Sequence, residues 1–193
     1  MKTDIILAGV GGQGILSIAA VIGAAALNNR LYIKQAEVHG MSQRGGAVYS
    51  HLRLSSRPVA SDLIPFGKAG VILSVEPMEA LRYLPYLTPD GWVVSNTQPF
   101  VNIDNYPDVA TVTAELQALP RRVLLDADAL AAGCGNAKAS NMVMLGAAIP
   151  FLGISLQDMK NAVYAVFAHK NIEVAQVNAK ALEAGFEKAV QQQ

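Results

Sequence analysis

Four glycines fall within six positions of the segment LAGVGGQGI (residues 7–15): Gly9, Gly11, Gly12 and Gly14, with Gln13 among them. Glycine accepts a positive φ and lets backbone N–H groups approach a ligand that a Cβ would hold away. Apolar runs on both sides of the glycines are typical of a strand, a tight turn and the start of a helix. N–H groups at a helix start lie at the positive end of the helix dipole, so they favour a phosphate or pyrophosphate. The segment therefore predicts an anion-binding turn without an acid, base or nucleophile.

The spacing of the glycines fits more than one ligand. Gly9, Gly11 and Gly14 match the G-x-G-x-x-G pattern of dinucleotide-binding proteins. With Gly12 included, the same segment matches the G-x-G-G-x-G turn of ATP-using adenylating enzymes. A tight turn that serves only the packing of helix on strand has the same composition. The motif by itself leaves these three interpretations open.

A second polar segment, EVHGMSQRGG (residues 37–46), follows a predicted strand. In a doubly wound sheet it lies at the same carboxyl edge as the glycine turn, where ligands bind. An arginine there can hold an oxyanion through two parallel hydrogen bonds, or it can pair with a surface carboxylate. The candidate binding residues are three hydrogen-bond donors and two glycines: Ser42, Gln43, Arg44, Gly45 and Gly46.

Glu37 lies at the position where dinucleotide-binding proteins keep an acid for the ribose, about 20 residues beyond the glycines. This position keeps a nicotinamide cofactor among the alternatives. His39 and His51 receive no catalytic role, because a single histidine more often completes a hydrogen bond than acts as an acid or base. We predict no catalytic residue and no metal ligand in this chain.

Strands and helices alternate along the chain. Ala47 to Leu54 alternates apolar and polar residues, which predicts a half-exposed antiparallel strand. Residues 88–91 (TPDG) predict a turn, residues 109–112 a short strand, and Ser140-Asn141 the cap of an apolar helix. Together the pattern predicts an α/β, Rossmann-like fold with a largely parallel sheet, an antiparallel strand and a helical C-terminal third, as one domain over residues 1–193.

Composition narrows the function classes. The chain has 15 Lys and Arg against 15 Asp and Glu, so no basic excess favours nucleic acid. Its apolar runs fall short of the ~20 residues that span a bilayer, and no signal-type segment precedes the first strand, which predicts a cytoplasmic protein. Cys134 is the single cysteine, so an iron–sulfur cluster would have to belong to another subunit. At 52% hydrophobic residues, part of the apolar surface is expected to meet a partner.

Five segments carry a resemblance to a known family: GVGGQG, EVHGMSQRGGAVYSHLR, VEPMEALRYL, LLDADALA and SNMVMLGA. Together they resemble the gamma-type subunit of 2-oxoacid:ferredoxin oxidoreductases, and the similarity extends from Asp4 to about Phe186. Within that family, HGMSQRGG before a strand is most similar to the beta subunit of indolepyruvate ferredoxin oxidoreductases.

The resemblance implies a division of labour between subunits. In the family, a large (alpha) subunit carries thiamine diphosphate, Mg and 4Fe–4S clusters, the electrons pass to ferredoxin, and the acyl group passes to coenzyme A. The present chain would be inactive alone and would contact coenzyme A at the glycine turn. The segment from Ser42 to Gly46 would border that site or the large subunit, and a second copy of the chain stays open as a further partner.

Two alternatives belong to other function classes. A free-standing NAD- or ATP-binding enzyme of Rossmann type would use the same glycine turn, although the sequence has no evident second mononucleotide-binding half. A scaffold subunit would keep the turn without any ligand.

Overall fold

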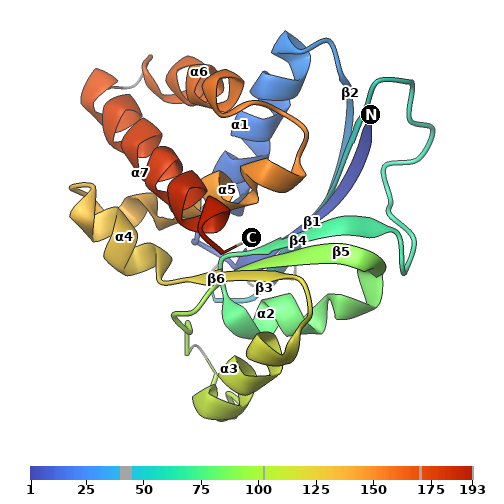
Figure 1. Ribbon diagram of the computed structural model, residues 1–193, viewed down its shortest axis with the longest axis vertical. Coiled ribbons are helices and arrows are strands. Elements are labelled where there is room, and N and C mark those ends of the chain that lie inside the picture. Colours follow the sequence, from blue (N-terminus) through green and yellow to red (C-terminus); the bar gives the residue numbers. More distant parts are fainter. Residues whose placement is uncertain (40–44, 102, 170, 193) are drawn as a thin grey trace.

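The computed structural model describes residues 1–39, 45–101, 103–169 and 171–192 of the chain (Figure 1). Its strands are β1 (Lys2–Val10), β2 (Tyr32–His39), β3 (Ala47–Ser55), β4 (Ala69–Ser74), β5 (Leu87–Asn96) and β6 (Arg122–Leu125). They form one sheet in the order β2-β3-β1-β4-β5-β6. Strands β1, β4, β5 and β6 are mutually parallel, and β3 runs antiparallel to both β1 and β2. The strands β1 and β2 therefore end at the same edge of the sheet.

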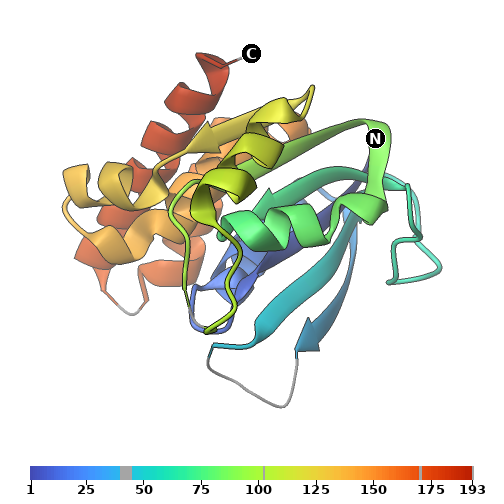
Figure 2. The ribbon, with the colours of Figure 1, turned by 90° about the horizontal axis from the view of Figure 1, so that it is seen from below.

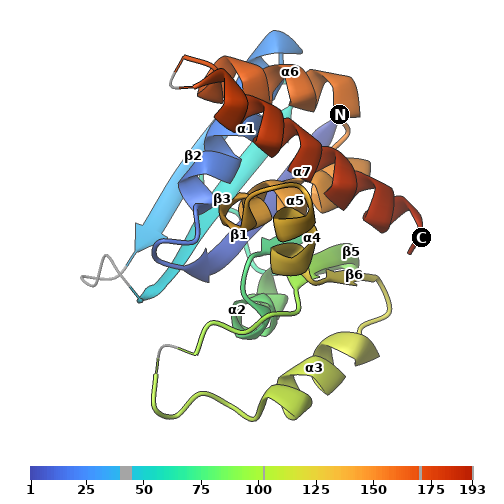
Figure 3. The same cartoon turned by 90° about the vertical axis from the view of Figure 1, so that its left-hand side faces the viewer.

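Helices cover both faces of this sheet. They are α1 (Ile15–Asn28), α2 (Pro77–Arg82), α3 (Val109–Ala118), α4 (Ala127–Gly133), α5 (Ser140–Ala148), α6 (Leu156–Phe167) and α7 (Ile172–Val190), with short 3₁₀ turns η1 (Leu84–Tyr86), η2 (Ala137–Ala139) and η3 (Ile149–Phe151). One face carries α1 and α4 to α7, and the other carries α2 and α3 (Figures 1 and 3). Seen from below, α2 and α3 lie across the second face (Figure 2).

The predicted fold class is confirmed, and so are the largely parallel sheet, the antiparallel strand and the helical C-terminal third. The core explains the continuous apolar runs of the parallel strands. Successive side chains of a strand point to opposite faces of the sheet, and both faces are covered here. Ile5 and Leu7 of β1 pack under α1 and α5, and Ile6 and Ala8 pack under α2 and α3.

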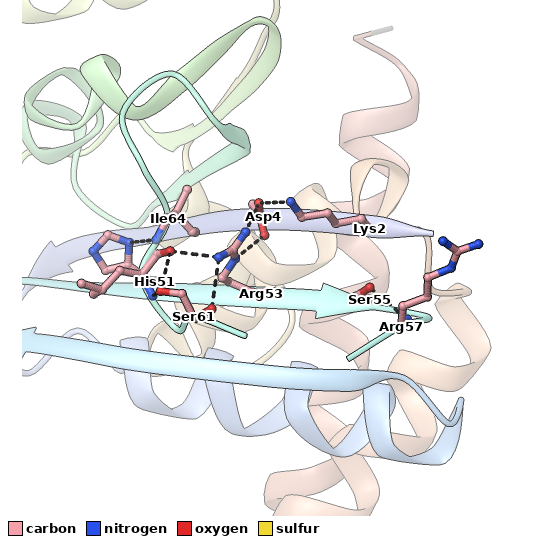
Figure 4. Close-up of polar contacts among 9 residues, drawn as sticks. Lys2, Asp4, His51, Arg53, Ser55, Arg57, Ser61 and Ile64 are labelled. Atoms are coloured by element: carbon pink, nitrogen blue, oxygen red, sulfur yellow. Dashed lines mark hydrogen bonds and ion pairs between the residues drawn. The ribbon is translucent and has the colours of Figure 1, made fainter. Parts of the chain in front are cut away.

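The prediction that β3 is half-exposed is wrong. Residues 50–55 of β3 are buried on both faces, because a loop over residues 56–68 folds back across the second face. Arg53 holds this loop: its guanidinium donates to the carbonyl oxygens of Ser61 (3.1 Å) and Leu63 (3.0 Å). The same guanidinium binds the Asp4 carboxylate of β1 through two hydrogen bonds of 2.8 and 3.0 Å (Figure 4). The polar Arg53 side chain of β3 thus makes its hydrogen bonds within the protein and not with water.

Residues 109–112 were predicted as a strand and belong to α3. The Asp108 carboxylate accepts a hydrogen bond from the Thr111 N–H (2.9 Å) and caps this helix. Val112 and Leu116, four residues apart, enter the core below the sheet. The cap and the i, i+4 spacing outweigh the β-branched composition of the segment.

Residues 88–91 were predicted as a turn and lie instead within β5, at a register shift opposite Ala69 to Val71. Gly91 is required there by close packing, because an added Cβ would overlap the Leu87 side chain. The proline and glycine thus mark an irregularity inside a strand rather than its beginning.

The closest helix packing joins α5 and α7. A Cβ added to Gly146 would overlap the Leu182 carbonyl, and one added to Gly185 would overlap the Val143 carbonyl. The two glycines therefore let the backbones of α5 and α7 touch.

Candidate functional site

The turn between β1 and α1 takes the shape that the glycines predicted. Gly12 has φ +102° and Gly14 has φ +82°, conformations that L side chains rarely adopt. Gly14 is the N-cap residue of α1 and provides no side-chain cap. Gly9 has another role, since an added Cβ would overlap the Val75 side chain at the end of β4. Gly9 therefore gives the neighbouring strand ends room to close up.

Backbone donors are left free where the helix begins. The amides of Gly12, Ile15 and Leu16 have no hydrogen-bond acceptor among the described residues. The first turn of α1 contains no acidic residue. Since a helix N-terminus carries roughly half a positive charge, this turn can bind an anion without any charged side chain.

Gly12, Ile15 and Leu16 all line one cavity of about 400 Å³. It lies between α1 and the end of the β2–β3 hairpin, and its lining is Val10, Gly11, Gly12, Gly14, Ile15, Leu16, Glu37 and Val48. Its volume is in the range of ordinary small-ligand sites. We call it the turn cavity. Gly9 and Gln13 of the predicted site are not part of its lining.

Gln13 serves the turn itself. Its Oε1 accepts a hydrogen bond from the Val10 N–H (2.7 Å) and its Nε2 donates to the Val75 carbonyl oxygen (3.4 Å). The side chain therefore clamps the end of β1 to the end of β4. Its predicted contact with a cofactor stays a prediction, and the amide groups that such a contact would use are engaged within the chain.

The segment after β2 meets the glycine turn at the predicted edge. The Gly11 N–H donates to the Gly46 carbonyl oxygen (2.9 Å), and the Gly45 N–H donates to the Gly11 carbonyl oxygen (3.4 Å). Ser42, Gln43 and Arg44 lie outside the described residues. The backbone bridge nevertheless brings both ends of that loop, Glu37 and Gly46, to the turn cavity or beside it.

Asn141 is part of this arrangement and was predicted in another role. Ser140-Asn141 was expected to cap α5, but Ser140 already belongs to that helix and Ala139 is its N-cap residue. The Asn141 Nδ2 instead donates to the Gly14 carbonyl oxygen (3.2 Å), and a Cβ at Gly14 would overlap this amide. A residue 127 positions away thus holds the left-handed N-cap of α1 in place. No local signal could have revealed this contact.

His51 lies on the opposite face of the sheet from α1. Its Nδ1 accepts a hydrogen bond from the Ile64 N–H (3.2 Å), in the loop that Arg53 also holds (Figure 4). Burial lowers the pKa of the His51 imidazole, an effect that nearby Asp62 opposes and Arg53 reinforces. A neutral imidazole that accepts a backbone hydrogen bond is a structural partner, in line with the role expected from the sequence.

The turn cavity contains one ionisable side chain among the described residues, Glu37, and it lacks the paired groups of an acid–base or nucleophilic site. No three His, Cys, Asp or Glu side chains of the described ranges are grouped to hold a metal ion. No described helix is long and apolar enough to cross a bilayer. The arrangement suits the binding and orientation of an anion.

Comparison with known proteins agrees with this geometry. The family described as Pyruvate ferredoxin/flavodoxin oxidoreductase matches residues 4–188. The chain belongs to this family. Two curated relatives are named Indolepyruvate oxidoreductase subunit IorB: the Archaeoglobus fulgidus protein is 32% identical over 98% of this chain and 96% of its own length, and that of Thermococcus kodakarensis is 37% identical over 96% and 95%. The resemblance inferred from the five segments is confirmed.

Solved structures of the family share the fold. The gamma subunit of a keto/oxoacid ferredoxin oxidoreductase from Geobacter sulfurreducens superposes with a TM-score of 0.72 at 23% identity, covering 98% of this chain and 99% of that one. The 2-oxoglutarate:ferredoxin oxidoreductase from Magnetococcus marinus, with 2-oxoglutarate, coenzyme A and succinyl-CoA bound, gives a TM-score of 0.76 at 21% identity. This chain covers only 31% of that longer chain. The same fold therefore occurs both as a separate subunit and within a longer polypeptide.

Proposed function

We propose that this chain is the small subunit of an indolepyruvate:ferredoxin oxidoreductase, folded as one cytoplasmic domain over residues 1–193, and that its glycine turn binds coenzyme A. The observation that carries the binding role is that the amides of Gly12, Ile15 and Leu16 have no acceptor among the described residues and that these three residues line the turn cavity. Coenzyme A is a phosphate-rich anion, which is the chemistry that a bare helix N-terminus favours.

Relatives support indolepyruvate as the 2-oxoacid. The relatives named for indolepyruvate reach 37% identity, whereas the common gamma subunit of pyruvate/ketoisovalerate oxidoreductases from Pyrococcus abyssi is 25% identical. The segment HGMSQRGG points in the same direction. The pocket that binds the substrate side chain and selects among 2-oxoacids would lie mainly on the large subunit.

In this mechanism the chain binds and orients coenzyme A. The free amides hold the phosphates, Gln13 and Asn141 keep the turn in its shape, and the apolar wall of Val10, Ile15 and Val48 excludes water on one side. Thiamine diphosphate, Mg and 4Fe–4S clusters, held by the large subunit, supply the decarboxylation of the 2-oxoacid and the transfer of its electrons to ferredoxin. The acyl group that remains passes to the thiol of coenzyme A.

Co-expression with the large subunit tests the assignment. The purified complex is expected to reduce ferredoxin when given indolepyruvate and coenzyme A, with a higher kcat/KM for indolepyruvate than for pyruvate or 2-oxoglutarate. Equal activity of the large subunit without this chain would favour the scaffold alternative. A higher kcat/KM for pyruvate would refute the substrate assignment.

One observation favours a second candidate, an NAD- or ATP-binding enzyme. Glu37 lies at the carboxyl end of β2 and lines the turn cavity, where a dinucleotide-binding protein would place its ribose-binding acid. In this sheet, however, β3 separates β2 from β1, unlike the arrangement in that fold. A thermal shift of the isolated chain with NAD or ATP, and none with coenzyme A in the complex, would support this candidate, since a ligand of the native state raises stability.

A further inference from the structure

The two edge strands of the sheet, β6 and β2, differ in how they are protected (Figure 3). Strand β6 has four residues, and the Gln192 side chain covers it: its Oε1 accepts from the Leu124 N–H (3.1 Å) and its Nε2 donates to the Leu124 carbonyl oxygen (3.0 Å). Strand β2 has eight residues, no proline and no register shift along β3. Natural proteins usually cover or interrupt a long edge strand, because its unpaired backbone groups can pair with another chain. The fold protects β6 in this way and leaves β2 open.

The unpaired backbone groups of β2 follow from its pairing with β3. The Ala36 carbonyl oxygen accepts a hydrogen bond from the Ser50 Oγ of β3 (3.2 Å), so the backbone of Ala36 points to β3. Neighbouring residues of a strand direct their backbone groups to opposite sides, so those of Ile33, Gln35 and Glu37 point away from β3. No described residue pairs with these groups. They have the spacing that one more antiparallel strand requires.

Helix α1 provides an uncharged surface beside this open edge. A Cβ added to Gly23 would lie 3.5 Å from the Ile33 Cδ1, so this side of the helix lies over β2. No acidic or basic residue occurs in α1, and its exposed side chains include Ala20 and Leu27, the latter 66% exposed. A chain that approaches β2 therefore buries no charge of α1.

The charges of β2 are compatible with a second copy of the same strand. In an antiparallel pair of identical strands, a two-fold axis at Gln35 places Lys34 opposite Ala36 and Glu37 opposite Ile33. An axis at Lys34 or at Glu37 would instead place two like charges directly opposite each other, which is destabilising. Only a few registers are therefore open, and the one centred on Gln35 is among them.

The exposed apolar side chains favour the register centred on Gln35. Tyr32 is 51% exposed and Val38 is 39% exposed, and both lie on the same face of β2 as Lys34. The axis at Gln35 places Tyr32 of each copy opposite Val38 of the other, which buries both residues twice. An axis at Ala36 would place Val38 opposite Lys34 and would leave Tyr32 outside the strand pair.

We propose that two copies of this chain join through β2, with the two strands antiparallel about a two-fold axis at Gln35 and the two sheets continuous. Such an interface is isologous and closes at two copies. Glu37 and the turn cavity lie toward the carboxyl end of β2, so the two turn cavities lie at opposite ends of the joined sheet. Each copy can then meet its own large subunit. The dimer does not depend on which ligand the turn cavity binds.

Charge variants of Ala36 test the pairing by sedimentation equilibrium of the full chain, where a dimer has twice the 20.4 kDa mass. Ala36→Lys places a lysine opposite Lys34 of the second copy, and Ala36→Glu, the matched variant, places a glutamate there. Two such pairs, each of about 0.2–1 kcal/mol, are expected to raise the dissociation constant of the dimer about 2- to 30-fold in Ala36→Lys and to lower it by a similar factor in Ala36→Glu. Equal dissociation constants for the two folded variants would refute the strand pairing.

A cysteine cross-link tests the same contact in the complex with the large subunit, in a Cys134→Ser background that removes the native cysteine. At the two-fold axis the Gln35 Cα atoms are expected about 5.5 Å apart, within the range that a disulfide spans. Gln35→Cys is therefore expected to give a covalent dimer of this chain under mild oxidation. Gln117→Cys, which replaces an exposed glutamine of α3, is the matched control and is expected to give none.

The contrary outcomes of the cross-link are distinct. A disulfide from Ala36→Cys and none from Gln35→Cys would refute the register. A complex with no cross-link of either kind, or one in which Gln35→Cys joins this chain to the large subunit, would overturn the proposal. If the Ala36 variants do not fold, the cross-link decides alone.

Discussion

Leu16→Glu provides the sharpest test of the glycine turn as an anion site. Leu16 is the second residue of α1, lines the turn cavity with Gly12 and Gly14, and is 56% exposed. A glutamate there loses little buried apolar surface. It also places an acid in a first turn that has none, which stabilises a helix by about 0.3–1 kcal/mol. The variant is therefore expected to fold at least as well as the parent.

The same carboxylate opposes a bound phosphate. At a separation of about 7 Å, two unit negative charges repel by roughly 0.6 kcal/mol in water and about 2.4 kcal/mol at an effective dielectric constant near 20. KM for coenzyme A is then expected to rise by roughly 3- to 60-fold. The value of kcat at saturating coenzyme A is expected to stay the same, because the turn binds the ligand and takes no part in the chemical step.

Steady-state kinetics of the complex with its large subunit measure this effect, with Leu16→Gln as the uncharged control. The difference in KM between the two variants is expected to narrow as salt is raised, since the screening length falls from about 8 Å at 0.15 M to about 3 Å at 1 M salt, well below the assumed separation. Equal KM values for Leu16→Glu and Leu16→Gln would show that no anion lies at the turn. A loss of kcat without a change of KM would also refute the reasoning.

Three further predictions concern the scaffold. Arg53→Met is expected to lower the free energy of unfolding by about 3 kcal/mol in urea denaturation, because it leaves Asp4 buried with Lys2 as its remaining partner. Gly146→Ala is expected to destabilise by more than about 2 kcal/mol through overlap of α5 with α7, whereas Gly133→Ala in α4 is neutral or stabilising. Burial lowers the pKa of His51 in the native state, so around and below pH 6.5 the unfolded state binds more protons than the native state. The free energy of unfolding is therefore expected to decrease as pH falls through 6.5, and this decrease is expected to be smaller in His51→Gln.

These predictions have clear contrary outcomes. An unchanged free energy of unfolding in Arg53→Met would mean that buried Asp4 does not depend on the Arg53 guanidinium. Similar unfolding midpoints for the two glycine variants would contradict the close packing of α5 on α7. Parallel pH profiles of the parent and His51→Gln would show that the imidazole titrates normally in the fold.

Much of the fold could be predicted because its signals are local. Helix α1 begins at Ile15, directly after the glycines, as the glycine pattern and the apolar run behind it predicted. Ser155 and Asn171 cap α6 and α7 through hydrogen bonds to residues two or three positions later. Residues 109–112 and 88–91 were predicted wrongly, because composition was weighed there without the cap at Asp108 and the register shift in β5.

The residues predicted to bind a ligand at the glycine turn have two different roles in the structure. Gly12 and Gly14 have the positive φ that their types indicated, and the free amides lie beside them. Gly9 and Gln13 were placed in the same motif, but one makes room for Val75 and the other clamps two strand ends. Sequence spacing cannot separate these roles, because they depend on which strand lies next to β1.

The sequence by itself determined the glycine turn, the start of α1 and the family, since backbone conformation and helix caps depend on neighbouring residues. Only the tertiary structure decided which distant groups surround that turn. Asn141 reaches Gly14 across 127 positions, and Gly146 and Gly185 let the backbones of α5 and α7 touch. Such contacts are fixed by the packing of whole helices, which no local pattern of residues specifies.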